Sequence, residues 1–112
     1  MSEYLFLYRG GSRPTGSPEQ MQNQMARWMA WLKDLGDKGH LKDAGHPLEP
    51  TGKVVKGGPK TITDAPFPEV KDLVGGFTLV KASDLNAAVA LTHGCPIFDV
   101  GGEVEVRPIM QM

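Results

Sequence analysis

The segment that most constrains the fold is Tyr4–Arg9, because both of its faces are apolar. Side chains alternate along a β-strand, so its three aromatic residues would share one face and its two leucines the other. A strand that is apolar on both faces is expected to be covered on two sides, which an exposed sheet edge does not provide. Any fold of this chain must therefore cover its first strand from both sides.

A helix is expected after the glycine-rich loop that follows this strand. Ser17 can cap it, Pro18 suits its first turn, and Gln20 completes a capping box, while Gly39 is the expected stop. Apolar side chains recur at helical spacing between these signals and predict one buried face. They are Met21, Met25, Trp28, Met29, Leu32 and Leu35.

The second half of the chain predicts further strands and one more helix. Ser83 is the expected cap of that helix, whose apolar residues include Leu85, Val89 and Thr92. The elements expected in chain order are a hairpin over residues 53–63, a strand over Gly75–Lys81, a helix over Asp84–His93 and a strand over Glu103–Arg107.

This order indicates a single α+β domain over residues 1–112. Two strand–helix–strand units in so short a chain predict a ferredoxin-like antiparallel sheet with two helices on one face. Such a sheet leaves its other face bare, and a chain of this size cannot hide that face alone. We therefore expect a homodimer, in which a second copy covers it.

The segment Asp64–Asp72 carries a family resemblance. It reads Asp-Ala-Pro-Phe-Pro-Glu-Val-Lys-Asp and resembles the Asp-Gly-Pro-Phe signature of the YCII-related (DGPF-type) family. Gly75–Phe77 is similar to that family's central strand, and 103–110 to its last strand. The resemblance implies a ferredoxin-like subunit that dimerises sheet to sheet into an α+β barrel, with a cleft near the signature aspartate.

The resemblance also bears on activity. Most members have no assigned activity, some relatives are lyases or isomerases that act on small ring compounds with a His–Asp pair, and others accompany extracytoplasmic-function sigma factors. Here Ala65 replaces the usual glycine, and Trp28 stands where enzymatic relatives have their helix histidine. The His–Asp mechanism is therefore not carried over to this chain.

Two residues are candidates for acid–base chemistry. Asp64, at a strand end beside the implied cleft, could act as a general base, although an aspartate that bonds the backbone of a turn is the more ordinary interpretation. His46, just before Pro47, could act as an acid or base, or could simply lie in a surface loop. The single cysteine, Cys95, is expected to be a buried structural thiol.

Four residues are candidates for ligand binding. Trp28 could line an apolar pocket or belong to the core. Phe67 could anchor the Asp64–Asp72 segment into a core, with that segment as the floor of a pocket. Arg9 and Arg107 could bind a carboxylate or phosphate together, or form salt bridges with Glu103, Glu105 or a dimer mate.

The net charge and the absence of known motifs indicate which kinds of partner and cofactor are not expected. The net charge of −1 gives no case for direct nucleic-acid binding. The histidine spacings match no zinc pattern and the glycine pairs no phosphate loop, so we expect no metal and no cofactor. Without a signal peptide or an apolar stretch of about 18 residues, we expect a cytoplasmic protein with no membrane contact.

These observations leave three functions open. The first is a homodimeric domain that binds or senses an unknown small molecule. The second is a lyase or isomerase that uses Asp64 as base with help from His46 or an arginine. The third, suggested by family association alone, is an accessory partner of a sigma factor.

Overall fold

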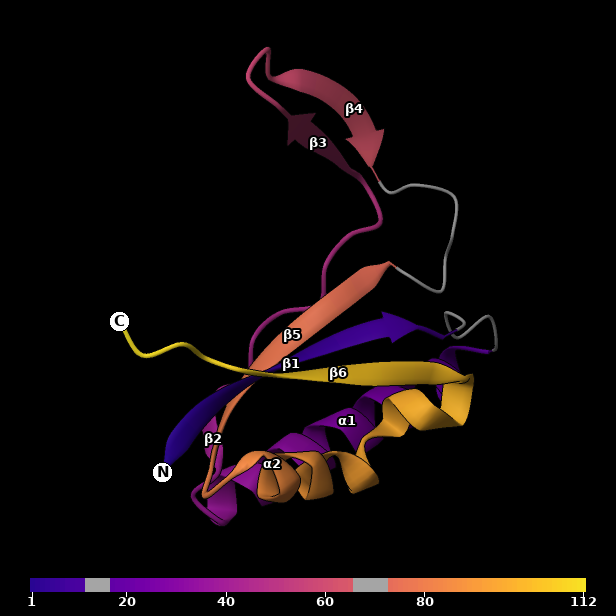
Figure 1. Ribbon diagram of the computed structural model, residues 1–112. Helices are drawn as coiled ribbons and strands as arrows, with labels where there is room; N and C mark the ends of the chain where they lie inside the picture. The colour runs from indigo at the N-terminus through magenta and orange to yellow at the C-terminus, as the bar shows by residue number, and fades with distance from the viewer. Residues whose placement is uncertain (12–16, 66–72) are drawn as a thin grey trace.

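The computed structural model describes residues 1–11, 17–65 and 73–112, with the backbone alone for residues 63–65 (Figure 1). The sheet and hairpin strands are β1 (Ser2–Gly10), β2 (Leu41–Asp43), β3 (Gly52–Lys56), β4 (Thr61–Ala65), β5 (Val74–Ala82) and β6 (Gly102–Pro108). The helical elements are α1 (Pro18–Asp37), α2 (Leu85–Leu91) and the 3-10 turns η2 (Thr92–Gly94) and η3 (Pro96–Val100).

The main sheet has four strands in the order β2-β5-β1-β6, and each neighbouring pair is antiparallel. Both helices lie on one side of it (Figure 1). The ferredoxin-like prediction is thereby confirmed. β1 is an inner strand, and Leu7 lies between Phe77 of β5 and Glu105 of β6.

The core lies between this sheet and the helices. Tyr4, Phe6 and Tyr8 of β1 point toward the helices and are buried, whereas the two leucines between them are half-buried on the opposite face. α1 contributes Trp31 and Leu35 to the same core. The alternation predicted for the first strand is confirmed, and its aromatic face is the inner one.

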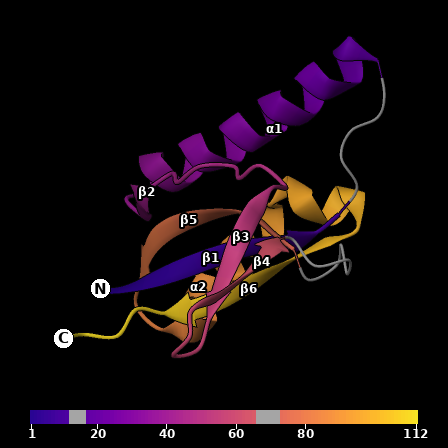
Figure 2. The same ribbon diagram turned by 90° about the horizontal axis from the view of Figure 1, so that it is seen from above.

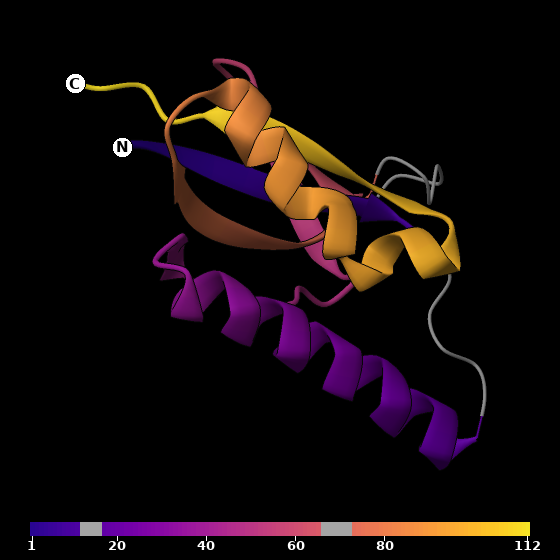
Figure 3. The same cartoon turned by 90° about the horizontal axis from the view of Figure 1, so that it is seen from below.

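The capping signals at the start of α1 work as predicted. The Ser17 hydroxyl accepts from the Gln20 amide, and the Gln20 side chain accepts from the Ser17 amide. The predicted buried face is wrong at Met21, Met25 and Met29, which are exposed. Figure 3 shows that the N-terminal half of α1, which carries Met21 and Met25, diverges from the strands, so the sheet does not cover that half.

α2 also differs in detail from the prediction. Its cap is Asp84, whose carboxylate accepts from an amide in the first turn, and Ser83 does not fill that role. Ala88 and Thr92 face the core, whereas Leu85 and Val89 are exposed. The small side chain of Ala88 lets the helix approach the sheet closely, which turns the larger residues outward. No described helix is long and apolar enough to cross a membrane.

The β3–β4 hairpin forms a separate two-stranded unit. Val55 lies opposite Ile62 within it, and the turn between the strands runs through Gly57 and Lys60, both at positive φ. The hairpin stands on the side of the main sheet opposite the helices (Figures 1 and 2). We call the main-sheet face on that side, formed around Leu5, Leu7, Phe77 and Leu79, the open face.

Candidate functional site

An aromatic cluster fills the space between β1 and α1. The Tyr8 and Trp28 rings meet edge to face, with centroids 4.9 Å apart at 82°. Trp31 contacts both of these rings and stacks on Phe6 at 6.3 Å. Its indole Nε1 donates to the Leu91 carbonyl oxygen at 3.1 Å, so Trp31 is held from both sides.

A chain of hydroxyl groups lies at the sheet side of this cluster. The Thr78 hydroxyl donates to the Ala44 carbonyl oxygen at 3.0 Å, and a carbonyl can only accept. Thr78 therefore accepts from the Tyr8 hydroxyl, whose oxygen lies 2.7 Å away. Burial raises the pKa of Tyr8 well above its ordinary value near 10, and the bond to Thr78 offsets this only in part. Tyr8 is thus a neutral donor whose oxygen retains capacity to accept.

Trp28 is the part of the cluster that solvent reaches. Tyr8 and Trp31 are each 7% exposed, whereas Trp28 is half-buried. The turn of α1 next to it is tied to η3, where the Arg27 guanidinium lies 2.5 Å from the Asp99 carboxylate. Gln24 adds a bond from its amide to the Pro96 carbonyl oxygen at 3.3 Å. These contacts tie α1 to η3 and so hold Trp28 at the border between the core and the solvent.

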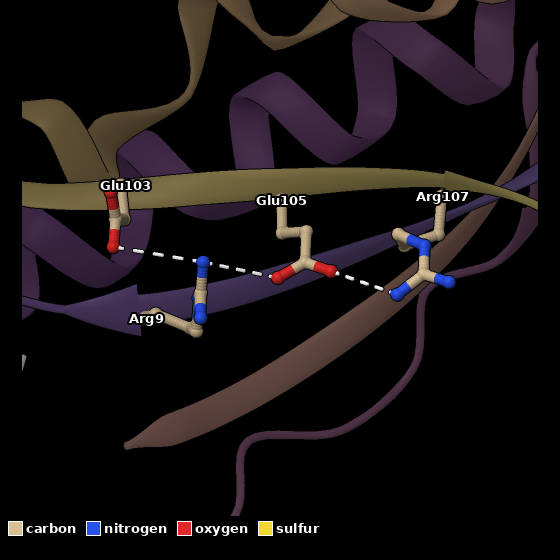
Figure 4. Close-up of polar contacts among 4 residues, drawn as sticks. All are labelled: Arg9, Glu103, Glu105 and Arg107. Carbon is tan, nitrogen blue, oxygen red and sulfur yellow. Dashed lines mark hydrogen bonds and ion pairs between the residues drawn. The ribbon is translucent and has the colours of Figure 1, made fainter. Parts of the chain in front are cut away.

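Arg9 and Arg107 lie on the open face in a row of alternating charges (Figure 4). One carboxylate oxygen of Glu105 lies 3.0 Å from Arg9, and the other lies 3.1 Å from Arg107. Glu103 lies 3.8 Å from the same Arg9 guanidinium. The salt bridges expected as the alternative to an anion site are therefore present, and the two arginines share one carboxylate. The Arg9 Nε is buried without a hydrogen-bond partner in the described structure.

His46 lies in the segment that follows β2 along the edge of β5. Its carbonyl oxygen accepts from the Phe77 amide at 3.3 Å, and its exposed ring meets the Phe77 ring edge to face. Gly45 makes this approach feasible, since its φ is +73° and a Cβ there would lie 1.7 Å from the Phe77 carbonyl oxygen. His46 thus borders the open face, away from the aromatic cluster.

The structure does not bring Asp64 to Trp28. The Asp64 backbone pairs with Lys53 in the hairpin, and the hairpin stands on the other side of the sheet from α1 (Figure 1). The side chain of Asp64 and the whole of Phe67 lie outside the described part of the chain. Of the five candidate residues whose backbone the structure describes, Trp28 lies on the helix side of the sheet, whereas Arg9, Arg107, His46 and the hairpin that carries Asp64 lie on the other side.

Two residues of the cluster site were missed from the sequence. The sequence places Tyr8 on the aromatic face of the first strand and Thr78 within the strand predicted over Gly75–Lys81, and it gives neither residue a role in a site. The available signal was that Thr78 is a polar residue on a strand face that is otherwise apolar, with Val80 and Ala82 beside it. A buried hydroxyl requires a partner, and an inward tyrosine of the same sheet is the natural one.

The structure also defines the remaining reactive groups. Cys95 is buried, as predicted, and burial raises the pKa of its thiol to about 11. Among the side chains that the structure describes, those of residues 1–11, 17–62 and 73–112, no group of three histidine, cysteine or acidic residues is arranged to hold a metal ion.

Comparison with known proteins places the chain in a family. No curated protein sequence matches it. Among solved structures it is similar to the 5-chloro-2-hydroxyhydroquinone dehydrochlorinase TftG from Burkholderia phenoliruptrix AC1100, in complex with 2,5-dihydroxybenzoquinone. The TM-score is 0.52 at 20% identity, over 98% of this chain and 95% of that one, which supports the fold. The YCII-related domain model matches residues 4–112, so the chain belongs to the YCII-related family.

Proposed function

We propose that this protein binds a small, flat ring compound against Trp28, at the solvent border of the aromatic cluster. The observation that carries the proposal is the pairing of a half-buried indole with a buried hydroxyl chain directly behind it. An aromatic face that solvent reaches offers a stacking surface, and the polar groups behind it can orient a ligand.

The hydroxyl chain indicates which ligand chemistry would be recognised. The Tyr8 proton is committed to Thr78 and the Thr78 proton to Ala44, so the free capacity at Tyr8 is an acceptor lone pair. A ligand that reaches this oxygen must bring a donor, such as a phenolic or enolic hydroxyl. Hydroxylated rings combine such a donor with a flat apolar face. The ligand of the similar structure, 2,5-dihydroxybenzoquinone, has a flat hydroxylated ring and is a suitable probe of stacking on Trp28. Its enolic hydroxyls are vinylogous acids that are ionised at neutral pH, so hydroquinone, whose phenols keep their protons there, is the probe that carries the donor.

A thermal-shift titration with 2,5-dihydroxybenzoquinone tests the proposal. Binding to the folded state should raise the melting temperature by mass action, with a rise that continues as the probe exceeds its dissociation constant. Trp28→Leu should abolish the rise. Phe77→Leu is the matched control, because Phe77 is a half-buried aromatic residue on the open face, on the other side of the sheet from Trp28. Equal rises in wild type and Trp28→Leu would refute a site at Trp28.

We further propose that the protein acts as a homodimer. Support comes from the open face, where four large apolar side chains lie on the side of the sheet that no described helix covers. Apolar patches of this kind mark interaction surfaces. Sedimentation equilibrium at micromolar concentration should give twice the chain mass, and a monomer throughout would contradict the proposal.

A lyase or isomerase acting on small ring compounds is the second candidate. Its support is that the similar structure belongs to an enzyme named for such a substrate, and that His46 and the hairpin with Asp64 lie on the same side of the sheet. In this candidate Asp64 is the base and His46 assists. In this candidate the wild-type protein should turn over members of a panel of hydroxyquinones, and the Asp64→Asn variant should not. Absence of turnover in both proteins would reject the enzyme candidate.

A pull-down from the native host tests the association with a sigma factor.

A further inference from the structure

Two large apolar side chains of the β3–β4 hairpin are left exposed by the described part of the chain. Val55 and Ile62 are directly opposite each other across the two strands, so their side chains share one face of the hairpin. They are 59% and 64% exposed, although both are large and apolar. A two-stranded hairpin is marginally stable in water and needs a third strand or a packing surface. This hairpin therefore requires a partner surface that its own described chain does not provide.

The overall shape supports the same conclusion. The radius of gyration is 15.6 Å, whereas a compact domain of this length is expected near ~13 Å. The excess agrees with the hairpin standing off the main sheet in Figures 1 and 2. The molecule is thus a compact sheet-and-helix body with a projecting arm.

The open face offers a matching receptor for such an arm. Leu5 and Leu7 of β1 lie beside Leu79 and Phe77 of β5 in the sheet register, and together they form an apolar strip. The hairpin projects on this same side, and no described helix lies there. Each copy therefore carries both an apolar arm and an apolar receiving strip. When the arm of each copy packs on the strip of the other about a two-fold axis, the contact is reciprocal and closes at two copies.

We infer that the β3–β4 hairpin is an intersubunit arm whose Val55–Ile62 pair packs on the open face of a second copy. This inference rests on the homodimer proposed above and adds which segment holds it together. The pair buries its apolar surface only in the dimer, and the hairpin gains the packing that a two-stranded unit lacks.

The dissociation constant of the dimer tests the inference. The variant Val55→Thr/Ile62→Thr keeps β-branched side chains, and hence the hairpin, while it removes apolar surface from both arms. It should weaken dimerisation roughly 100-fold. The control Met25→Gln/Met29→Gln removes an exposed apolar pair of similar size from α1 and should leave the constant unchanged.

Hydrogen exchange of the hairpin amides gives a second readout that does not need variants. In wild type, the amides that pair β3 with β4 should be protected well above the dissociation constant and exchange rapidly well below it. The amides that pair β1 with β5 report that the body stays folded in every sample. A wild-type dimer with unprotected hairpin amides, and with the same constant in the threonine variant, would overturn the arm and leave the homodimer standing. A wild type that is monomeric at all concentrations would overturn both.

Discussion

The hydroxyl chain makes a prediction that can be worked out bond by bond. Thr78→Val keeps the shape of the side chain but leaves the buried Tyr8 hydroxyl without its acceptor. An unsatisfied buried hydroxyl costs about 2 kcal/mol, and the lost bond from Thr78 to the Ala44 carbonyl adds about 1 kcal/mol, so the variant should lose about 3 kcal/mol. Tyr8→Phe removes the donor itself and leaves Thr78 still bonded to Ala44, so its cost is that of one hydrogen bond, about 1 kcal/mol.

The double variant Tyr8→Phe/Thr78→Val distinguishes this arrangement from two independent bonds. Once Tyr8 is phenylalanine, valine at position 78 strands no hydroxyl, so the double variant should lose about 1 kcal/mol for each of the two missing hydrogen bonds. That total of about 2 kcal/mol is well short of about 4, the sum of the two single variants. For 112 residues, 1 kcal/mol corresponds to about 4 °C in melting temperature. Urea unfolding, followed by far-UV circular dichroism, measures the free energy of unfolding of the wild type, the two single variants and the double variant. Losses that add within about 0.3 kcal/mol would refute the shared bond.

Three further predictions concern buried or constrained groups. Burial holds the pKa of Tyr8 above its value near 10 in the unfolded chain. The contribution of Tyr8 to the free energy of unfolding is therefore complete below pH 10 and declines above it. The melting temperature of the wild type should fall more steeply between pH 9 and 11 than that of Tyr8→Phe. Burial raises the pKa of Cys95 to about 11, so an aromatic disulfide reagent at pH 8 should label it slowly in the native protein and rapidly in urea; equal rates would contradict its burial. Gly45→Ala should lower the free energy of unfolding by about 3 kcal/mol or more, because the new Cβ would meet the Phe77 carbonyl oxygen. Gly39→Ala, at a similar φ but in open space, should lower it by about 1 kcal/mol. Equal losses in urea unfolding would contradict the contact between residue 45 and Phe77.

The elements of the fold were predictable because their signals are local. The alternation in Tyr4–Arg9 defines a strand within six residues, and the Ser17–Gln20 capping box defines a helix start within four. The strand order follows from the sequence of elements, since two strand–helix–strand units have few ways to pack on one sheet.

The buried faces were less predictable because burial depends on what lies opposite. Helical spacing groups Met21, Met25 and Met29 with Trp28 on one side of α1, but it does not tell where the sheet beneath the helix ends. Leu85 and Val89 turn outward for a related reason: the smaller Ala88 permits close packing. Periodicity identifies residues that share a face, and tertiary packing decides whether that face is covered.

The candidate site was predictable only at Trp28. Tyr8 and Thr78 are 70 positions apart in the chain, and no local pattern joins them. Arg9 and Arg107 were predicted near the ends of strands, where they could act together or form salt bridges. Both arginines contact Glu105, and this depends on a strand register that the sequence does not show.

The indole resonances of the protein provide the most direct test of the proposed ligand site. The chain has two tryptophans, so a ¹⁵N–¹H spectrum contains two indole signals, one from Trp28 and one from Trp31, whose indole is bonded to Leu91. Titration with 2,5-dihydroxybenzoquinone should move the Trp28 signal in a saturable way and the Trp31 signal less. A Trp28 signal that does not move at probe concentrations up to about 1 mM would contradict a ring-binding site at Trp28. A dissociation constant above about 1 mM corresponds to a binding free energy weaker than about −4 kcal/mol.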